Sequence, residues 1–241
     1  MFNQMKVKAA MLGFVSASTL LGMAAQAAPI NLLTNGSFEA DGGSLTGWAT
    51  AGTQEVFAPA AVVTNVTTSC CFGEAVPVDT VVGGSPDAAG THGVYFVDDL
   101  AHQTLDQALF LAAGKYEVGF DAYSPFNGFA NGGDALFSAK IAGIQFANYT
   151  VHTQNSPGVW FHFSTLADVL TSGVYGVTFE YQTFGGVSAD VVIDRAYIAA
   201  RDGDGDGIPI GPVPVPEPAT LVLMGLGLIA AGVARRRKRT A

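Results

Sequence analysis

Strict alternation of apolar and polar residues is the feature that most constrains the fold of this chain. In Tyr116–Tyr123, the residues Tyr, Val, Phe and Ala alternate with Glu, Gly, Asp and Tyr, and Tyr175–Gln182 repeats the pattern. A two-residue period is typical of strands with one buried face, whereas a surface helix needs a period of about 3.6 residues. Almost no helical period occurs between residues 28 and 200, so the sequence predicts an all-β fold.

Further short apolar stretches with turn signals between them, such as Asn131–Gly133, bring the expected total to about ten short strands. They are Ile30–Thr34, Trp48–Thr50, Glu55–Val66, Gly93–Val97, Gln103–Leu111, Ala135–Phe146, Val159–Ser164 and Ala189–Ala199. Many evenly spaced strands are typical of a β-sandwich or jelly roll. We therefore expect a single β-sandwich over residues 28–200.

The first 27 residues have the three parts of a secretory signal peptide. Lys6 and Lys8 precede an apolar stretch from Ala9 to Ala25, and Ala25-Gln26-Ala27 forms a small-x-small cleavage site. We expect cleavage after Ala27 and export of the remaining chain. A first transmembrane helix is the alternative.

The last 41 residues have a different organisation from the predicted sandwich. Residues 201–216 form an acidic linker rich in Gly and Pro, and residues 217–241 form a sorting or anchor segment. The apolar run 219–234 spans about 24 Å as a helix, slightly less than a bilayer core of about 30 Å. We expect this short hydrophobic helix to hold the chain in the membrane before processing, with the following basic residues on the cytoplasmic side.

This terminus closely resembles the PEP-CTERM sorting signal of Gram-negative bacteria. The matching parts are Val215–Thr220, the apolar Leu221–Val233 and the arginine-rich end, and the motif residues are Pro216, Glu217, Pro218, Arg235, Arg236 and Arg237. The resemblance implies processing by an exosortase near Pro-Glu-Pro. It also implies a transient anchor in the inner membrane, followed by delivery to the cell surface or extracellular matrix. An ordinary tail anchor is the alternative.

The charge distribution excludes one class of partner. Between residues 28 and 218, four basic residues accompany all 20 acidic residues of the chain. A nucleic-acid-binding surface needs several Lys or Arg side chains to neutralise phosphates. We therefore expect no nucleic-acid partner, and a surface that is soluble and attracts cations.

A second resemblance covers the predicted sandwich. Asn31–Glu39 followed by Gly47-Trp48 resembles the opening of galactose-binding-like, or carbohydrate-binding-module, jelly rolls, and Val191–Ile198 resembles their closing strand. The resemblance implies a jelly roll, carbohydrate binding and a structural calcium ion held by Glu39 and Asp194. Arg195 stands where many relatives have a second acid. The alternative is that Glu39 and Asp194 are surface acids, with Asp194 paired to Arg195 or another base.

A second, weaker calcium candidate lies in the linker. Asp202, Asp204 and Asp206 occupy positions 1, 3 and 5 of an EF-hand-like loop, with Gly207 at position 6. Position 12, which should be a bidentate Glu, is Val213, and this argues against a complete EF-hand. A weak calcium loop and a flexible acidic linker both stay open.

The two cysteines of the chain, Cys70 and Cys71, are adjacent. Neighbouring Cα atoms lie about 3.8 Å apart, below the usual disulfide range of about 4.4–6.8 Å. A bridge between them would be strained, although the exported compartment is oxidising. A strained disulfide, intermolecular pairing and free or buried thiols are the three alternatives.

The segment from Tyr123 to Asp134 predicts the glycan-binding site. It places aromatic rings, which stack on sugar faces, among polar residues in a loop: Tyr123, Phe126, Asn127, Phe129 and Asn131.

Sequence signals for catalysis are weak, because the chain has neither His-Glu-x-x-His nor Gly-x-Ser-x-Gly. Asp98 and Asp99 would point to opposite faces of a continuing strand. Glu117 and Asp121 share a strand face but lie about 13 Å apart, farther than glycosidase carboxylates.

We therefore expect that the protein is not an enzyme. We expect an exported surface or matrix protein that binds extracellular polysaccharide. The main alternative is a purely structural matrix protein or adhesin that contacts proteins. A glycan-active hydrolase is the third.

Overall fold

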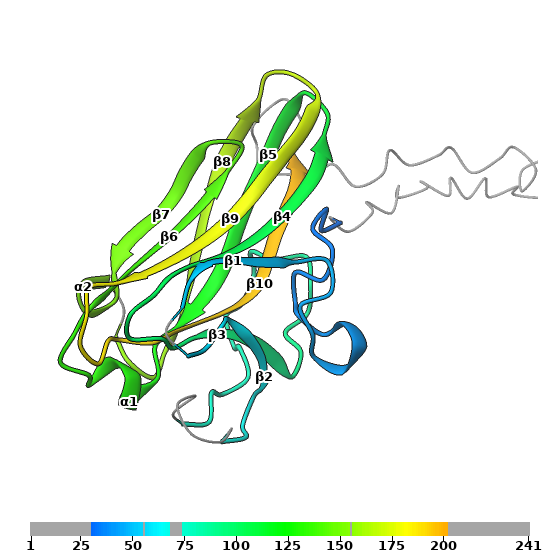
Figure 1. The fold of residues 1–241 in the computed structure, drawn as a ribbon. Coiled ribbons are helices and arrows are strands. Elements are labelled where there is room, and N and C mark those ends of the chain that lie inside the picture. Colours follow the sequence, from blue (N-terminus) through cyan, green and yellow to red (C-terminus); the bar gives the residue numbers. More distant parts are fainter. Residues whose placement is uncertain (1–29, 55, 68–73, 155, 202–241) are drawn as a thin grey trace, which may run out of the picture.

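The computed structural model describes residues 30–54, 56–67, 74–154 and 156–201, and it confirms the all-β prediction (Figure 1). Ten strands form two five-stranded antiparallel sheets that pack face to face as a β-sandwich. The strands are β1 (Ala49–Thr53), β2 (Ala60–Val63), β3 (His92–Phe96), β4 (His102–Leu111), β5 (Gly114–Tyr123), β6 (Ala135–Ile141), β7 (Ile144–Thr150), β8 (Trp160–Val169), β9 (Gly173–Thr183) and β10 (Val191–Arg201).

Three short helices complete the described part of the chain: η1 (Ala40–Gly42), α1 (Phe126–Phe129) and α2 (Val151–Gln154). One sheet, called sheet A here, has the strand order β1-β4-β9-β6-β7, and the other, sheet B, has the order β2-β3-β10-β5-β8. The two strongly alternating sequences form β5 and β9, which lie near the middle of their sheets. In each strand, every second residue is apolar and faces the opposite sheet.

The main core fills the space between the sheets and is rich in aromatic rings. Phe96 and Phe120 of sheet B meet Phe137 and Phe179 of sheet A, and all four are fully buried. The Phe96–Phe137 and Phe120–Phe179 pairs are T-shaped, with ring centroids 5.4 and 5.1 Å apart. Such pairs add to the free energy gained by burying the rings, so they hold the two sheets together.

A second, smaller core lies on the outer face of sheet B, where Tyr95, Tyr123, Trp160 and Val192 pack with Val62 and Val76. We call residues 74–87 the strap, because this segment crosses that face. The indole Nε1 of Trp160 donates a hydrogen bond of 3.1 Å to the carbonyl oxygen of Pro77 on the strap. Sheet B is therefore covered on both faces, which explains why every residue of Val191–Ala199 is buried.

Three predicted strands differ from the structure. Of the stretch Glu55–Val66, only Ala60–Val63 forms a strand among the described residues. The stretch Ala135–Phe146 is not one strand. It contains β6 and the start of β7, which a two-residue turn joins into a hairpin. Ala142 and Gly143 both have positive φ, 49° and 79°, as a tight hairpin turn requires. The stretch Ile30–Thr34 is not a strand either, although the backbone N–H of Leu32 donates to the carbonyl oxygen of Ile198 at 2.8 Å.

A bulge interrupts β10 beside β5. The register shifts between Asp194, opposite Asp121, and Tyr197, opposite Gly119. Arg195 lies at this shift with a positive φ of 47°. A bulge re-aims side chains, and here it turns the side chains of both Asp194 and Arg195 toward the acidic residues on the outer face of sheet B.

One end of the sandwich collects loops from both sheets. Because the strands are antiparallel, the C-terminal ends of β1, β3, β5 and β9 meet the N-terminal ends of β2, β6 and β10 there. We call this edge the loop end; it carries α1, at the bottom of the view in Figure 1. The residues that connect these strands come from distant parts of the sequence and converge in space.

We predict that Gly119→Ala lowers the free energy of unfolding by about 2 kcal/mol. A Cβ at this position would lie 2.5 Å from the carbonyl oxygen of Phe163 and 2.7 Å from the Tyr197 ring. Denaturant unfolding followed by tryptophan fluorescence measures the change. The matched control is Gly176→Ala in β9, where a Cβ meets no atom within 4 Å. Equal stability of the two variants would contradict this packing.

Candidate functional site

The predicted glycan-binding segment lies at the loop end, and its aromatic rings have different surroundings. Tyr123 is buried against Trp160, with ring centroids 5.3 Å apart. Phe129 is half-buried and meets the His152 ring edge-to-face at 5.0 Å. Phe126 is 58 % exposed, so of the three rings it is the one displayed to solvent.

Local contacts fix the position of Phe126. Its backbone N–H donates to the carboxylate of Glu74 on the strap, and its ring covers Gly158, where a Cβ would approach the ring to 2.3 Å. Asn127, next to it, is exposed, whereas Asn131 is half-buried and donates from Nδ2 to the carbonyl oxygen of Ser188 at 2.7 Å. The segment thus presents one fixed aromatic ring and an amide that ties it to the 184–190 loop.

A pocket of about 360 Å³ opens at the loop end. Its walls come from four separate segments, and one of the predicted residues, Asn131, lines it. The lining residues are Val56, Phe57, Val97, Asp98, Asp99, Asn131, Val187 and Asp190. Its volume lies at the small end of the range for ligand sites, about 300–1,000 Å³, and apolar walls with a few polar groups are typical of such sites.

The acidic residues of the pocket are held by neighbouring loops. Asp98 Oδ2 accepts a hydrogen bond of 3.2 Å from the backbone N–H of Val56, and Asp99 Oδ1 accepts one of 2.9 Å from Ser188. Asp98 and Asp99 follow the end of β3 at Phe96, so they do not point to opposite faces of a strand as predicted. Both residues line the pocket. The sequence did not identify Asp98, Asp99 or Asp190 as site residues, since a pocket of this kind depends on strand register.

Asp190 lines the pocket although it is deeply buried, with 4 % of its surface exposed. Its Oδ2 accepts a hydrogen bond of 3.1 Å from the hydroxyl of Tyr95. Burial, with the nearby charges of Asp99 and Glu74, raises the pKa of Asp190 to about 7. Gly128 packs directly on this carboxylate, since a Cβ there would lie 2.4 Å from Oδ2.

The outer face of sheet A carries a different polar group. Glu180 is bonded to His102 at 2.5 Å and to the ammonium of Lys140 at 2.8 Å. The hydrogen bonds from Lys140 and His102 lower the pKa of Glu180 to about 2. Beside this group, Thr178 Oγ1 donates to Asp106 Oδ1 at 2.6 Å. Lys140 thus compensates the charge of Glu180 on this face.

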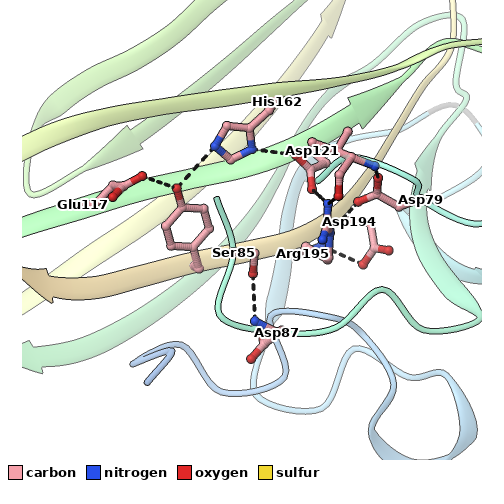
Figure 2. Close-up of polar contacts among 10 residues, drawn as sticks. Asp79, Ser85, Asp87, Glu117, Asp121, His162, Asp194 and Arg195 are labelled. Atoms are coloured by element: carbon pink, nitrogen blue, oxygen red, sulfur yellow. Dashed lines mark hydrogen bonds and ion pairs between the residues drawn. The ribbon is translucent and has the colours of Figure 1, made fainter. Parts of the chain in front are cut away.

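A third polar group is buried under the strap on sheet B (Figure 2). The guanidinium of Arg195 lies between two carboxylates, with Nε 2.6 Å from Asp79 and Nη2 2.7 Å from Asp121. Asp121 also contacts His162 Nδ1 at 2.6 Å. Burial raises the pKa of Asp194 to about 8 and that of Asp79 to about 6. This network connects the strap to β5, β8 and β10.

The two residues predicted to hold calcium have different partners. Glu39 Oε1 accepts hydrogen bonds of 2.6 Å from the backbone N–H groups of Thr91 and His92, and Oε2 lies 2.8 Å from His92 Nδ1. Asp194 Oδ1 accepts a hydrogen bond of 2.6 Å from the backbone N–H of Arg195. Calcium takes six to eight oxygen ligands, and a carboxylate saturated by N–H donors does not fit that role.

Among the described residues, no group of three or more His, Cys, Asp or Glu side chains is placed to hold a metal ion. Arg195 supplies positive charge to the acidic cluster beside Asp194. These contacts do not fit a calcium ion at Glu39 and Asp194, so that site rests on the resemblance alone.

Several predicted features lie outside the described residues. They are the signal peptide, Cys70 and Cys71, the acidic residues Asp202, Asp204 and Asp206, and the sorting segment with its apolar run 219–234. Within the described ranges, no helix is long and apolar enough to cross a membrane.

Comparison with known proteins supports the sorting signal directly. Residues 214–238 match the PEP-CTERM protein-sorting motif, which implies an exported protein that is anchored transiently in the membrane and processed by an exosortase. No curated protein matches the chain.

The fold is similar to several solved structures. TmCBM61 in complex with beta-1,4-galactotriose is 20 % identical with a TM-score of 0.48, and the match covers 71 % of this chain and 99 % of that one. A structure described as CBM4 is 14 % identical with a TM-score of 0.39, covering 70 % and 99 %. A cyclase from Fischerella sp. TAU, in complex with 4-(1H-Indol-3-yl)butan-2-one, is 14 % identical with a TM-score of 0.47, covering 71 % and 98 %. Each of the three is matched over nearly its whole length.

We predict that the melting temperature of the full chain is the same in calcium and in chelator. The Glu39 carboxylate already has N–H donors on both oxygens, and Arg195 already neutralises the acids near Asp194. Differential scanning fluorimetry measures the melting temperature in each condition. A calcium-dependent rise that Glu39→Gln abolishes would establish the metal site instead.

We predict that Asp190→Asn stabilises the protein relative to wild type as the pH rises. An acid whose pKa is raised on folding binds more protons in the folded state, so the wild-type free energy of unfolding falls between about pH 4 and pH 7. The asparagine variant lacks this loss. The free energy of unfolding of the variant, relative to that of the wild type, should rise over that window and level off above about pH 7. Urea unfolding at each pH measures it. A constant difference at every pH would contradict the raised pKa.

Proposed function

We propose that this protein is exported, processed by an exosortase, and binds an extracellular polysaccharide at the loop end without cleaving it. Delivery to the cell surface or extracellular matrix of a Gram-negative bacterium is part of this proposal, and the sorting motif at 214–238 supports it. The observation that carries the binding function is the pocket, lined by carboxylates, one amide and apolar side chains, at the same end as the exposed ring of Phe126.

The pocket and Phe126 provide the two kinds of contact that sugars need. Hydroxyl groups donate hydrogen bonds to carboxylates such as Asp99, and the apolar face of a pyranose ring packs on an exposed aromatic ring. Further apolar side chains stand around the opening, since Val56 and Val187 line the pocket and are more than half exposed. Rigid strands hold these loops, which favours a binding surface.

A purely structural matrix protein or adhesin is the second candidate function. One observation favours it: Phe110 of β4 lies directly opposite Val174 of β9, and both side chains are about two-thirds or more exposed, 67 % and 72 %. This apolar pair stands on the outer face of sheet A, far from the loop end, where it could contact another protein.

We predict that the full chain, purified in detergent, is retained by the exopolysaccharide of the producing organism. Phe126→Ala should weaken retention about tenfold, equivalent to ~1.4 kcal/mol, because the variant loses a stacking surface. Affinity electrophoresis in gels that contain the polymer measures the change.

The matched control is Phe110→Ala, which removes a ring of similar exposure, 67 % against 58 %, at a distance from the pocket. If Phe110→Ala, and not Phe126→Ala, abolished the interaction with the matrix, the protein-contacting function would replace this proposal. Loss of retention in Lys140→Ala alone would move the binding site to the outer face of sheet A.

A further inference from the structure

The end of the sandwich opposite the loop end carries two turns without charge. The β4–β5 turn and the β8–β9 turn lie side by side there, because β4 pairs with β9 and β5 pairs with β8 along nearly their full lengths. Neither residues 109–114 nor residues 169–176 include an Asp, Glu, Lys, Arg or His. We call this edge the exit end, because β10 ends there at Arg201, opposite Lys115. It lies at the top of the view in Figure 1.

Three large apolar side chains of these two segments are exposed. Leu170, Val174 and Phe110 have 87 %, 72 % and 67 % of their surface in solvent. Phe110 lies directly opposite Val174, and Leu170 belongs to the adjoining turn. The backbone N–H of Ala113 donates a hydrogen bond of 2.9 Å to Ser172 Oγ, which joins the two turns into one surface. Single exposed apolar residues are common on proteins, but a group of them on an uncharged surface indicates a contact.

Tyrosine hydroxyls satisfy backbone carbonyl groups in both turns. The hydroxyl of Tyr116 donates to the carbonyl oxygen of Ala112 at 2.8 Å, and the hydroxyl of Tyr175 donates to that of Thr171 at 2.6 Å. A backbone polar group that leaves water is costly unless it is hydrogen-bonded within the protein. These two bonds therefore lower the cost of removing the turns from water.

The exit end is also where the chain leaves the sandwich toward its predicted membrane anchor. The 17 residues 202–218 separate Arg201 from the apolar run 219–234, and the sorting motif implies a transient anchor in the membrane. Flexible linkers of this length average roughly 20–25 Å between their ends. The pocket lies about 33 Å farther away, at the other end of β10. While the chain is anchored, the exit end is therefore the part of the sandwich nearest the bilayer.

From this combination we infer that the exit end inserts Phe110, Leu170 and Val174 into the surface of the membrane that anchors the chain. The inference goes beyond the proposed function and does not depend on polysaccharide binding. Large apolar side chains with tyrosines beside them are typical of protein surfaces that lie at the level of the lipid headgroups. The first charged residues of β5 and β8 beyond the turns, Lys115 and Asp168, stand opposite each other, so this pair adds no net charge.

A lipid surface fits this group better than a second copy of the chain does. Together the three side chains expose roughly 400 Å², about half of the ~800 Å² that each partner buries in a standard protein interface. The β8–β9 turn also projects beyond the neighbouring strands (Figure 1). A projecting apolar edge needs a partner that deforms around it, as the headgroup region of a bilayer does.

The test measures whether a ring at the exit end reaches the lipid. The full chain is reconstituted in vesicles of phosphatidylethanolamine and phosphatidylglycerol, with or without bromine on the acyl chains, which quenches tryptophan fluorescence on contact. Phe110→Trp places an indole at the exit end, and the matched control, Phe184→Trp, replaces a ring of similar exposure, 67 % against 64 %, at the loop end. We expect bromine to lower the fluorescence of Phe110→Trp about twofold relative to that of Phe184→Trp. Trp48 and Trp160 are common to both variants, so the difference reports the added indole.

A second substitution tests whether the apolar side chains produce the contact. Leu170→Ser, added to Phe110→Trp, removes the most exposed of the three side chains and should restore most of the lost fluorescence. The matched control is Val82→Ser on the strap, where the side chain is 98 % exposed and lies outside the exit end, and it should leave the quenching unchanged. Neither substitution touches the core, so the melting temperature should stay the same in both variants.

Four outcomes would overturn the inference. Equal quenching of Phe110→Trp and Phe184→Trp would show that the exit end is not the contacting face. No quenching, in vesicles with which the full chain floats, would show that the anchored sandwich stands clear of the bilayer. Failure of the full chain to float would remove the anchor on which the inference rests. A dimer in detergent that Leu170→Ser dissociates would assign this face to a second copy. Retention on the exopolysaccharide, measured in detergent, tests the proposed function separately.

Discussion

The contact on which much of this structure depends is the guanidinium of Arg195 between Asp79 and Asp121. Arg195 projects from the bulge in β10, Asp121 stands on β5, and Asp79 belongs to the strap. Arg195 also donates from Nη2 to the carbonyl oxygen of Val81 at 2.7 Å. One side chain thus fastens the strap to the middle of sheet B. Breaking such a pair is costly, because an unpaired charge would stay buried.

The strap in turn shapes the loop end. Its closure buries the small core in which Tyr95 packs, and the hydroxyl of Tyr95 is the donor that holds Asp190 at the pocket. The strap also provides Glu74, which accepts the backbone N–H of Phe126 and so fixes the displayed ring. The pocket and the exposed aromatic ring are therefore positioned by a segment that lines neither the main core nor the pocket.

The sequence predicted the parts of the fold that depend on local alternation. The strands β5 and β9 follow from their two-residue period, because one face of each is buried against the opposite sheet. The β6–β7 hairpin did not follow, since Ala142-Gly143 lacks the Asn or Asp that usually marks such a turn. The four-residue helix α1 was too short to produce a helical period within the expected loop.

The candidate site was predictable only in part, and for a physical reason. Phe126 and Asn131 belong to one continuous loop whose composition indicates binding, and the structure places both at the loop end. Asp98 and Asp190 are 92 positions apart in the numbering and meet because β3 and β10 pair in one register. Pairing between distant strands is a long-range property that residue types alone do not reveal.

The direction of β10 separates the pocket from the end at which the chain leaves the sandwich. This strand begins at Val191, beside the pocket, and ends at Arg201, from which the chain continues toward the sorting motif. Eleven residues of strand extend about 33 Å. A molecule held by its tail would therefore carry its pocket on the far tip, about one domain length from the point of attachment.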